Sequence, residues 1–271
     1  MKIKFLLSIL VVTLLFSCSS SSSSDSNTET DNSPQINYFP LALKNYWKYN
    51  VLTNAITQTD SLYVSNDTII NTKVYKKLKT RNMPIGFFSS LLNRNTLRID
   101  GSKLLLTGSL SFNFGATLPI DLSVTDYIIY QENVSNNQNL GSVTGTIYQT
   151  VENYPLVIDY TLKSTSIESL PTFTSNGQVY SDVKKVKTVL NAKIITTISV
   201  AGIDFPVIVS ILDPQDVITS YQYYSKNIGN VYTNTIINYR LNALPKGITL
   251  TIPPTGNQTQ EEFLVTYDVS H

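Results

Sequence analysis

Strict alternation of apolar and polar residues over 112–124 limits the fold of this chain more than any other feature. Every second residue of the stretch is apolar: Phe112, Phe114, Ala116, Leu118, Ile120, Leu122 and Val124. This period of two matches a β-strand with one buried and one solvated face, and it does not match a helix. We expect Gly115 to bend or split the stretch and Pro119 to place it at a sheet edge or a bulge.

Strand signals recur along the rest of the chain. A second alternation covers 203–211, and a strand is expected at 46–51 with Trp47 as a core anchor. Further strands are predicted at 61–65, 73–79, 96–106, 126–133, 143–151, 156–166, 178–200, 217–226, 229–240, 248–252 and 262–268. Turn residues separate them at Asp100-Gly101, Ser175-Asn176-Gly177, Ile228-Gly229-Asn230 and Pro245-Lys246-Gly247. Only 84–93 suits a short helix or an apolar loop, so we expect an all-β protein with at most one or two short helices.

Composition supports the same fold class. The chain carries 17 Tyr and 10 Phe, and only 14% of its residues are charged. Aromatic and β-branched side chains suit the pleated, half-buried surface of a sheet.

The N-terminus has the pattern of a secretory signal peptide. Lys2 and Lys4 lead into an apolar run over 5–16. That run is too short for a spanning helix, which needs about 20 apolar residues, and it suits a signal-peptide core.

The end of this run resembles the lipobox of bacterial lipoproteins. It reads Leu15-Phe16-Ser17-Cys18, followed by six serines. The resemblance implies cleavage after Ser17 and acylation of Cys18. A lone exported cysteine can otherwise be a free thiol, an intermolecular disulfide or a buried inert residue; the position of Cys18 favours lipidation. The domain then has no disulfide and rests on its core alone.

Three segments follow from these signals. Residues 1–17 are the signal peptide, 18–34 are the lipidated cysteine with a flexible Ser-rich tether, and 35–271 are one antiparallel β domain. Asp25–Glu29 is interpreted as solvated linker rather than a calcium loop, because it lacks the loop's glycine and a following helix. Processing leaves 18 basic against 19 acidic residues, a net charge of −1, which argues against nucleic acid as a partner.

The start of the domain adds a family resemblance. The segment Tyr38–Asn50, YFPLALKNYWKYN, resembles the opening of exported lipoproteins of Bacteroidetes with the pattern Y-F-P-L…W-x-Y. Asn45 stands where that pattern has glycine. The segments 177–186 and 223–232 resemble later parts of the same pattern. These families are similar to LolA-like proteins, which implies one large antiparallel sheet curved as an incomplete barrel around an apolar groove.

Candidate catalytic and metal-binding groups are scarce. The only histidine is His271, at the terminus, which removes Ser-His-Asp and Cys-His catalysis and His-based metal sites. Paired carboxylates remain for a glycosidase: Asp121 with Asp126, Asp213 with Asp216, and Glu261 with Glu262. Each pair lies beside turn residues, where acids are ordinarily solvated. We predict no catalytic residue, no metal site, no cofactor and no enzymatic activity.

Two groups of residues each have a structural or chance explanation and a functional alternative. Tyr221, Tyr223, Tyr224, Tyr232 and Tyr239 are explained by cross-strand packing, with an exposed stacking surface for sugars or peptides as the alternative. Ser61 and Thr68 follow aspartates as in the D-[ST]-aliphatic acceptor pattern of Bacteroidetes O-glycosylation, a pattern that also arises by chance.

These observations support three functions. The first is a non-catalytic lipoprotein of the cell envelope, anchored in the outer membrane by Cys18, whose half-barrel binds an apolar or lipid-like ligand. The second is a surface-displayed binding or scaffold module for protein or glycan. The third is an enzyme that uses carboxylates alone. The ligand-binding residues and the side of the membrane stay open at this stage.

The anchor predicts a definite mass for the protein purified from its native membrane. Intact-protein mass spectrometry should find a chain that begins at Cys18 and carries acyl groups there. Recovery of a chain that retains residues 1–17 with Cys18 unacylated contradicts this reading.

Overall fold

A computed structural model describes residues 38–114, 118–199, 204–245 and 249–270. Ser33–His271 forms one compact unit of the chain. The signal peptide, Cys18, the tether and His271 lie outside the described residues, so the predictions made for them stay predictions.

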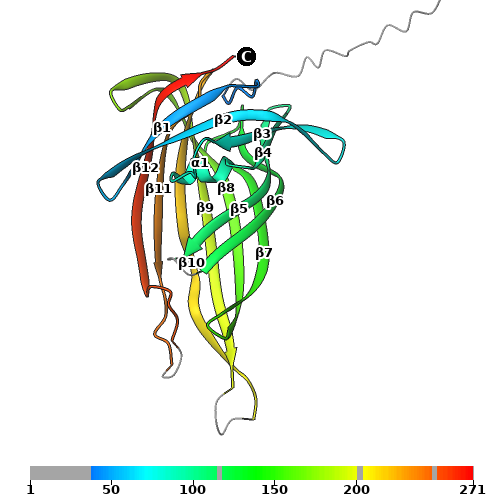
Figure 1. Ribbon diagram of the computed structural model, residues 1–271, viewed down its shortest axis with the longest axis vertical. Coiled ribbons are helices and arrows are strands. Elements are labelled where there is room, and N and C mark those ends of the chain that lie inside the picture. The colour runs from blue at the N-terminus through cyan, green and yellow to red at the C-terminus, as the bar shows by residue number, and fades with distance from the viewer. Residues whose placement is uncertain (1–37, 115–117, 200–203, 246–248, 271) are drawn as a thin grey trace, which may run out of the picture. The chain divides into compact units, whose positions relative to one another are not determined.

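The described residues form twelve strands and one short helix (Figure 1). They are β1 (Tyr46–Thr53), β2 (Ile56–Ile70), β3 (Lys73–Thr80), α1 (Phe87–Leu92), β4 (Thr96–Asp100), β5 (Lys103–Phe114), β6 (Leu118–Gln131), β7 (Asn139–Val151), β8 (Tyr154–Ser175), β9 (Gln178–Ile198), β10 (Val207–Ser225), β11 (Gly229–Arg240) and β12 (Thr255–Asp268).

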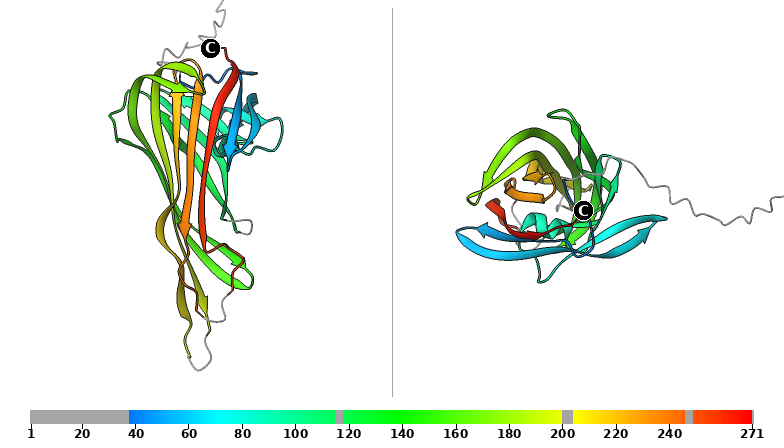
Figure 2. Two further views of the ribbon diagram at one scale, coloured as in Figure 1. Left: turned by 90° about the vertical axis from the view of Figure 1, so that its left-hand side faces the viewer. Right: turned by 90° about the horizontal axis from the view of Figure 1, so that it is seen from above.

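All twelve strands belong to one antiparallel sheet, in the order β6-β5-β4-β3-β2-β1-β12-β11-β10-β9-β8-β7. The last strand of the chain, β12, lies beside the first, so two runs of sequential hairpins join into one surface. The sheet curves into a nearly closed barrel with one unsealed seam between β6 and β7 (Figure 2). The predicted fold class, a single antiparallel sheet curved as an incomplete barrel with a short helix, is confirmed.

The observed strand boundaries differ from the predicted ones near glycine and proline residues. The alternating stretch 112–124 is the end of β5 and the start of β6, which pair as a hairpin with Phe112 opposite Ile120. Pro119 lies on the terminal strand β6, as predicted, where its missing N–H leaves no ladder bond unmade. The predicted strand at 248–252 is wrong: residues 249–254 form no strand, because Pro253 and Pro254 cannot donate to a ladder, and β12 begins at Thr255.

Aromatic side chains fill one end of the barrel. Phe39 stacks on Trp47 with ring centroids 4.8 Å apart, and it meets Phe88 of α1 edge-on at 6.3 Å. Tyr49 and Tyr224 also contact Phe88 edge-on. These rings are fully or almost fully buried, so the predicted role of Trp47 as a core anchor agrees with its place. Helix α1 lies inside the curve of the sheet because Phe88 belongs to this cluster (Figure 2).

Midway along the barrel, polar side chains on β9, β10 and β11 point inward. Thr188 donates to Gln222, Gln222 donates to Ser220, and the hydroxyls of Ser220 and Thr235 lie 2.7 Å apart. These residues are buried. Because each satisfies another, these four polar side chains are buried without being left unpaired.

Asn45, which stands where the Y-F-P-L…W-x-Y pattern has glycine, joins both ends of the domain. Its amide donates to the carbonyls of Pro40 and Ser270, and its side-chain oxygen accepts from the Ser270 amide at 2.9 Å. The side chain is buried. Asparagine therefore has a structural reason to stand here: it ties the entry loop to the last residues of the chain.

A glycine at the β10–β11 turn allows the tryptophan to pack, and this predicts the effect of adding one methyl group. Gly229 has φ +113°, and a Cβ there would lie 2.9 Å from Nε1 of Trp47. That nitrogen donates to the Ile228 carbonyl. Gly229→Ala should therefore lower the free energy of unfolding by about 3 kcal/mol, from backbone strain plus displacement of the indole.

Gly177 is the matched control. It also has a positive φ, +76°, but nothing lies within 4 Å of its missing Cβ. Gly177→Ala should lower the free energy of unfolding by the backbone strain alone, about 1 kcal/mol. Urea denaturation of both variants checks the difference, and equal losses would show that the approach to Trp47 does not matter.

Candidate ligand-binding cavity

A cavity of about 480 Å³, partly open to solvent, lies between the α1 segment and the neighbouring strands. Residues of the α1 segment, β5, β10, β11 and β12 line its apolar part: Ile85, Phe87, Phe112, Ile218, Ile237 and Tyr239. A volume of this size lies within the range of roughly 300–1,000 Å³ that small-molecule sites occupy.

The lining carries no acidic or basic side chain. Its polar members are neutral: Asn54, Ser90, Ser111, Thr255, Asn257, Gln258 and Gln260, with the phenol of Tyr239. A charged ligand group would lose its hydration there without gaining an ionic partner, which is costly. The cavity therefore suits a ligand that is apolar and uncharged.

Three side chains of the barrel wall hold the roof of this cavity. Asp60 of β2 accepts hydrogen bonds from the amides of Ile85 and Gly86, the latter at 2.7 Å. Gln260 of β12 accepts from the Phe87 amide at 2.5 Å and donates to the Ile85 carbonyl.

Glu262 of β12 completes the set. Its carboxylate accepts from the amides of Phe88 and Ser89 and from the Ser89 hydroxyl, at 2.5, 3.2 and 2.9 Å. With Asp60 and Gln260 it satisfies five consecutive amides, Ile85–Ser89, around a helix start that otherwise leaves such groups unpaired. A Cβ on Gly86 would lie 2.2 Å from a carboxylate oxygen of Glu262, so only glycine fits there.

Burial changes the acidity of Glu262. Its removal from water raises its pKa from 4.5 to about 7, against the lowering effect of the bonds from Phe88 and Ser89; the charge of Asp60 adds to the rise. Asp60 and Glu262 are both buried, and among the described residues no lysine or arginine forms an ion pair with either. The roof thus rests on two acids whose only compensation is hydrogen bonding.

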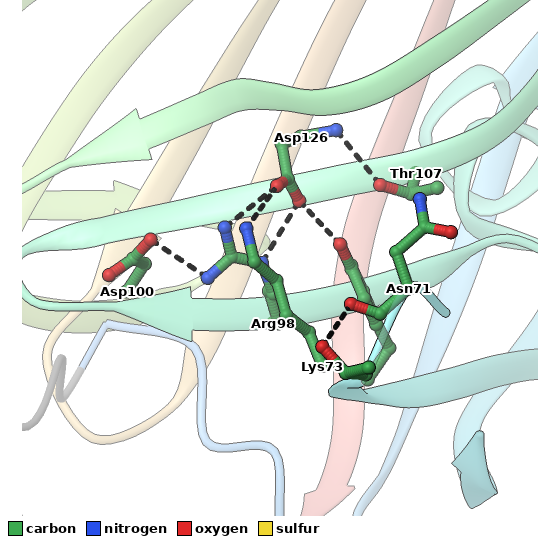
Figure 3. A network of polar contacts seen from close by, with 8 residues as sticks. Asn71, Lys73, Arg98, Asp100, Thr107 and Asp126 are labelled. Atoms are coloured by element: carbon green, nitrogen blue, oxygen red, sulfur yellow. Dashed lines mark hydrogen bonds and ion pairs between the residues drawn. The ribbon is translucent and has the colours of Figure 1, made fainter. Parts of the chain in front are cut away.

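Asp126, a member of one predicted carboxylate pair, lies in an ionic cluster on the outside of the barrel (Figure 3). Arg98 binds its two oxygens at 2.9 and 2.8 Å, Tyr75 donates to it at 2.7 Å, and Lys73 lies 3.3 Å away. The Arg98 guanidinium holds the pKa of this carboxyl well below its ordinary value. A carboxylate held this way joins β3, β4 and β6 and cannot serve as a general acid.

The other carboxylate pairs do not form a catalytic arrangement either. Glu261 and Glu262 are neighbours on β12 and point to opposite faces: Tyr232 donates to Glu261 outside, while Glu262 lies inside. Asp213 accepts from Ser210, a bond that lowers its pKa, and Asp216 accepts from Asn191. No pair of these acids lines the cavity.

The predicted tyrosine cluster is divided between the two faces of the sheet. Tyr224 belongs to the buried aromatic end, and Tyr239 lines the cavity. Tyr223 and Tyr232 lie on the outer face, where Phe173 stacks on Tyr223 at 4.3 Å and Tyr232 contacts Phe263 at 5.2 Å. Since these rings cover one another, cross-strand packing accounts for them better than an open stacking surface does.

Ser61 and Thr68, the predicted glycosylation positions, both lie on β2 and are partly exposed. The aspartates before them are already engaged. Asp60 is buried under the α1 segment, and Asp67 pairs with Lys76 at 2.7 Å.

Two further observations limit the chemistry of the described part of the chain. Nowhere in it do three His, Cys, Asp or Glu side chains gather closely enough to hold a metal ion. It also contains no helix with the length and apolar character needed to cross a bilayer.

Comparison with known proteins finds one weak structural similarity. No protein-family model matches the chain, and no curated protein matches it. Among solved structures, the chain is similar to a protein from Parabacteroides distasonis titled a "putative lipoprotein", with 14% identity and a TM-score of 0.42. The match covers 86% of this chain and 99% of that one. At this level of similarity it supports no conclusion about function.

The raised pKa of Glu262 predicts an unusual pH dependence of stability. Between about pH 4.5 and pH 7 the folded state keeps a proton that the unfolded state has released. The free energy of unfolding should therefore fall as the pH rises through this window, by roughly 3 kcal/mol in total, and level off above it. Glu262→Gln, which cannot ionise, should remove this fall.

The neighbouring variant Glu261→Gln is the matched control, because that side chain lies on the outer face. It should keep the pH dependence of the parent protein. Chemical denaturation at a series of pH values measures all three proteins. If Glu262→Gln shows the same pH profile as the parent, the buried carboxyl titrates at its ordinary value.

Proposed function

We propose that this protein is a non-catalytic lipoprotein of the cell envelope whose barrel binds an uncharged, apolar ligand under α1. The cavity carries the proposal. It lies between the barrel wall and the α1 segment and is partly open to solvent, its apolar lining includes Ile218, Ile237 and Phe112, and its polar lining is neutral.

The shape of the interior favours this function over a purely structural barrel. The buried core runs along the barrel from the aromatic cluster around Phe88 to Ile120 and Ile158, whereas the space beside α1 is left unfilled. Packing a cavity of this volume with side chains would increase stability, because empty apolar space forfeits dispersion contacts.

The membrane part of the proposal depends on the sequence. Cys18 would carry the acyl groups, residues 19–34 would be the tether, and the outer membrane would hold the anchor. Lipid-like molecules are present at high local concentration at such a surface. A cavity with no charged lining suits their neutral, apolar portions better than a free carboxylate or a phosphate.

The alternative, a surface-displayed module that binds protein or glycan, is less well supported. Its sequence basis was an exposed tyrosine surface, and the outer rings of Phe173, Tyr223 and Tyr232 are stacked on one another. The carboxylate enzyme is disfavoured because Asp126 is held by Arg98 and Glu262 by α1.

A bulky side chain in the cavity should block ligand binding. Ile237 lines the cavity, whereas its neighbour Ile236 points outward and is 37% exposed. With the uncharged fluorescent probe N-phenyl-1-naphthylamine, the parent protein should show saturable binding, and Ile237→Trp should weaken it about tenfold or more. Ile236→Trp, the matched control on the same strand, should bind as the parent does.

Circular dichroism of both tryptophan variants checks that they remain folded. Absence of saturable binding by the parent, or equal loss in both variants, would contradict binding in this cavity.

A further inference from the structure

The seam of the barrel leaves the outer edge of β7 without a partner strand. In the described residues β7 and β6 end the sheet order on opposite sides, and no ladder joins them. The two strands approach at Gly141, where a Cβ would lie 3.1 Å from the Ile128 carbonyl oxygen. There the hydroxyl of Ser164 on β8 reaches across to the same carbonyl at 2.5 Å.

Beyond Gly141, residues 143–151 of β7 pair with β8 alone, and within the described residues no strand pairs with their outer edge. Pairing with β8 continues through this stretch to Val151 opposite Tyr154, so β7 itself is well ordered as a strand. A free edge of nine residues offers a row of N–H and C=O groups to another strand.

Along residues 143–151, β7 also lacks the features that protect strand edges; its register irregularity lies before this stretch, between Asn139 and Gly141. Asn139–Val151 contains no charged residue and no proline. The other terminal strand, β6, carries exposed Pro119 and Asp121 and a bulge at Asp126 with φ +51°. Proline, charge and bulges are the usual means by which sheets prevent edge pairing, so only one side of the seam is protected.

We propose that the free edge of β7 pairs with β7 of a second copy of this chain, antiparallel, about a twofold axis near Ile147. Such pairing continues the sheet from one copy into the other. It is independent of the ligand proposed for the cavity.

The residues of β7 fit this partner on both faces. An axis at Ile147 places Thr144 opposite Thr150 and Thr146 opposite Tyr148 on the outer face, where all four are exposed. Since directly opposed residues point to the same face, threonines and the tyrosine meet outside, while on the inner face the two Ile147 side chains meet at the axis, with Gly145 opposite Gln149 and Val143 opposite Val151.

Charge favours a second copy over an unrelated strand. In a twofold pair, residue i of one copy faces residue j of the other and j faces i, so a strand whose charges share one sign would place like charges near one another, which is destabilising. An edge with no charge avoids this repulsion, whereas selection for a charged partner would have left complementary charges on β7. Antiparallel pairing makes the long axes of the two barrels point in opposite directions. Two copies anchored in the same bilayer would therefore lie with their strands parallel to the membrane surface.

The compact unit Ser33–His271 can be tested without the anchor, because its core lies within it. Sedimentation velocity over a concentration series should show a monomer that becomes a dimer. Thr144→Lys/Tyr148→Lys places four lysines in one row across the axis and should raise the dissociation constant at least about tenfold.

The matched control is Ile236→Lys/Asn238→Lys, which adds the same charge to exposed positions of β11, a strand paired on both sides by β10 and β12. It should dimerise as the parent does. Mixing Thr146→Cys with Tyr148→Cys should give a disulfide-linked pair under oxidation, since Cys18, the only native cysteine, is absent from this unit. A monomer at every concentration, or a dimer unaffected by the β7 lysines, overturns the proposal.

Discussion

Two buried carboxylates that hold one turn of helix organise the interior of this barrel. Asp60 on β2 and Glu262 on β12 lie on opposite sides of β1, and both point inward at the α1 segment. Their hydrogen bonds position Phe88 at the centre of the aromatic cluster and Phe87 above the cavity. Without this hold, a six-residue helix would have little reason to form, because so short a helix is not stable by itself.

This arrangement is costly, and the cost explains the unusual pKa of Glu262. A buried acid normally gains a lysine or arginine partner, yet here the compensation comes from backbone amides that the helix start leaves unpaired. The two problems solve each other: the helix gains acceptors and the acids gain donors. Burial away from water is nevertheless the main reason why the pKa of Glu262 is raised to about 7, and the nearby charge of Asp60 adds to the rise.

The same short helix lies between the aromatic cluster and the cavity. On one side of it, aromatic rings from the entry loop, β1 and β10 pack tightly. On the other side lies the cavity lined by Ile218 and Ile237, while the core continues along the barrel through residues such as Ile120 and Ile158. The seam between β6 and β7 has a geometric cause. The β5–β6 hairpin leans toward the centre of the barrel (Figure 1). Its inward residues, such as Leu122, are buried there, so the hairpin does not extend the sheet beside β7.

The amino-acid sequence by itself determined the all-β class and the strands on either side of a bend within 112–124, because period-two alternation and turn residues are local signals; for 84–93 it left a short helix and an apolar loop as alternatives. It also located Trp47 in the core. The tertiary structure decided where the polar residues go: Gln222, Thr235 and Glu262 occupy inward positions that a local pattern assigns to solvent. Most of their partners lie on other elements, up to 174 residues away along the chain, so only the curvature of the whole sheet brings those donors and acceptors together and leaves a cavity beside them.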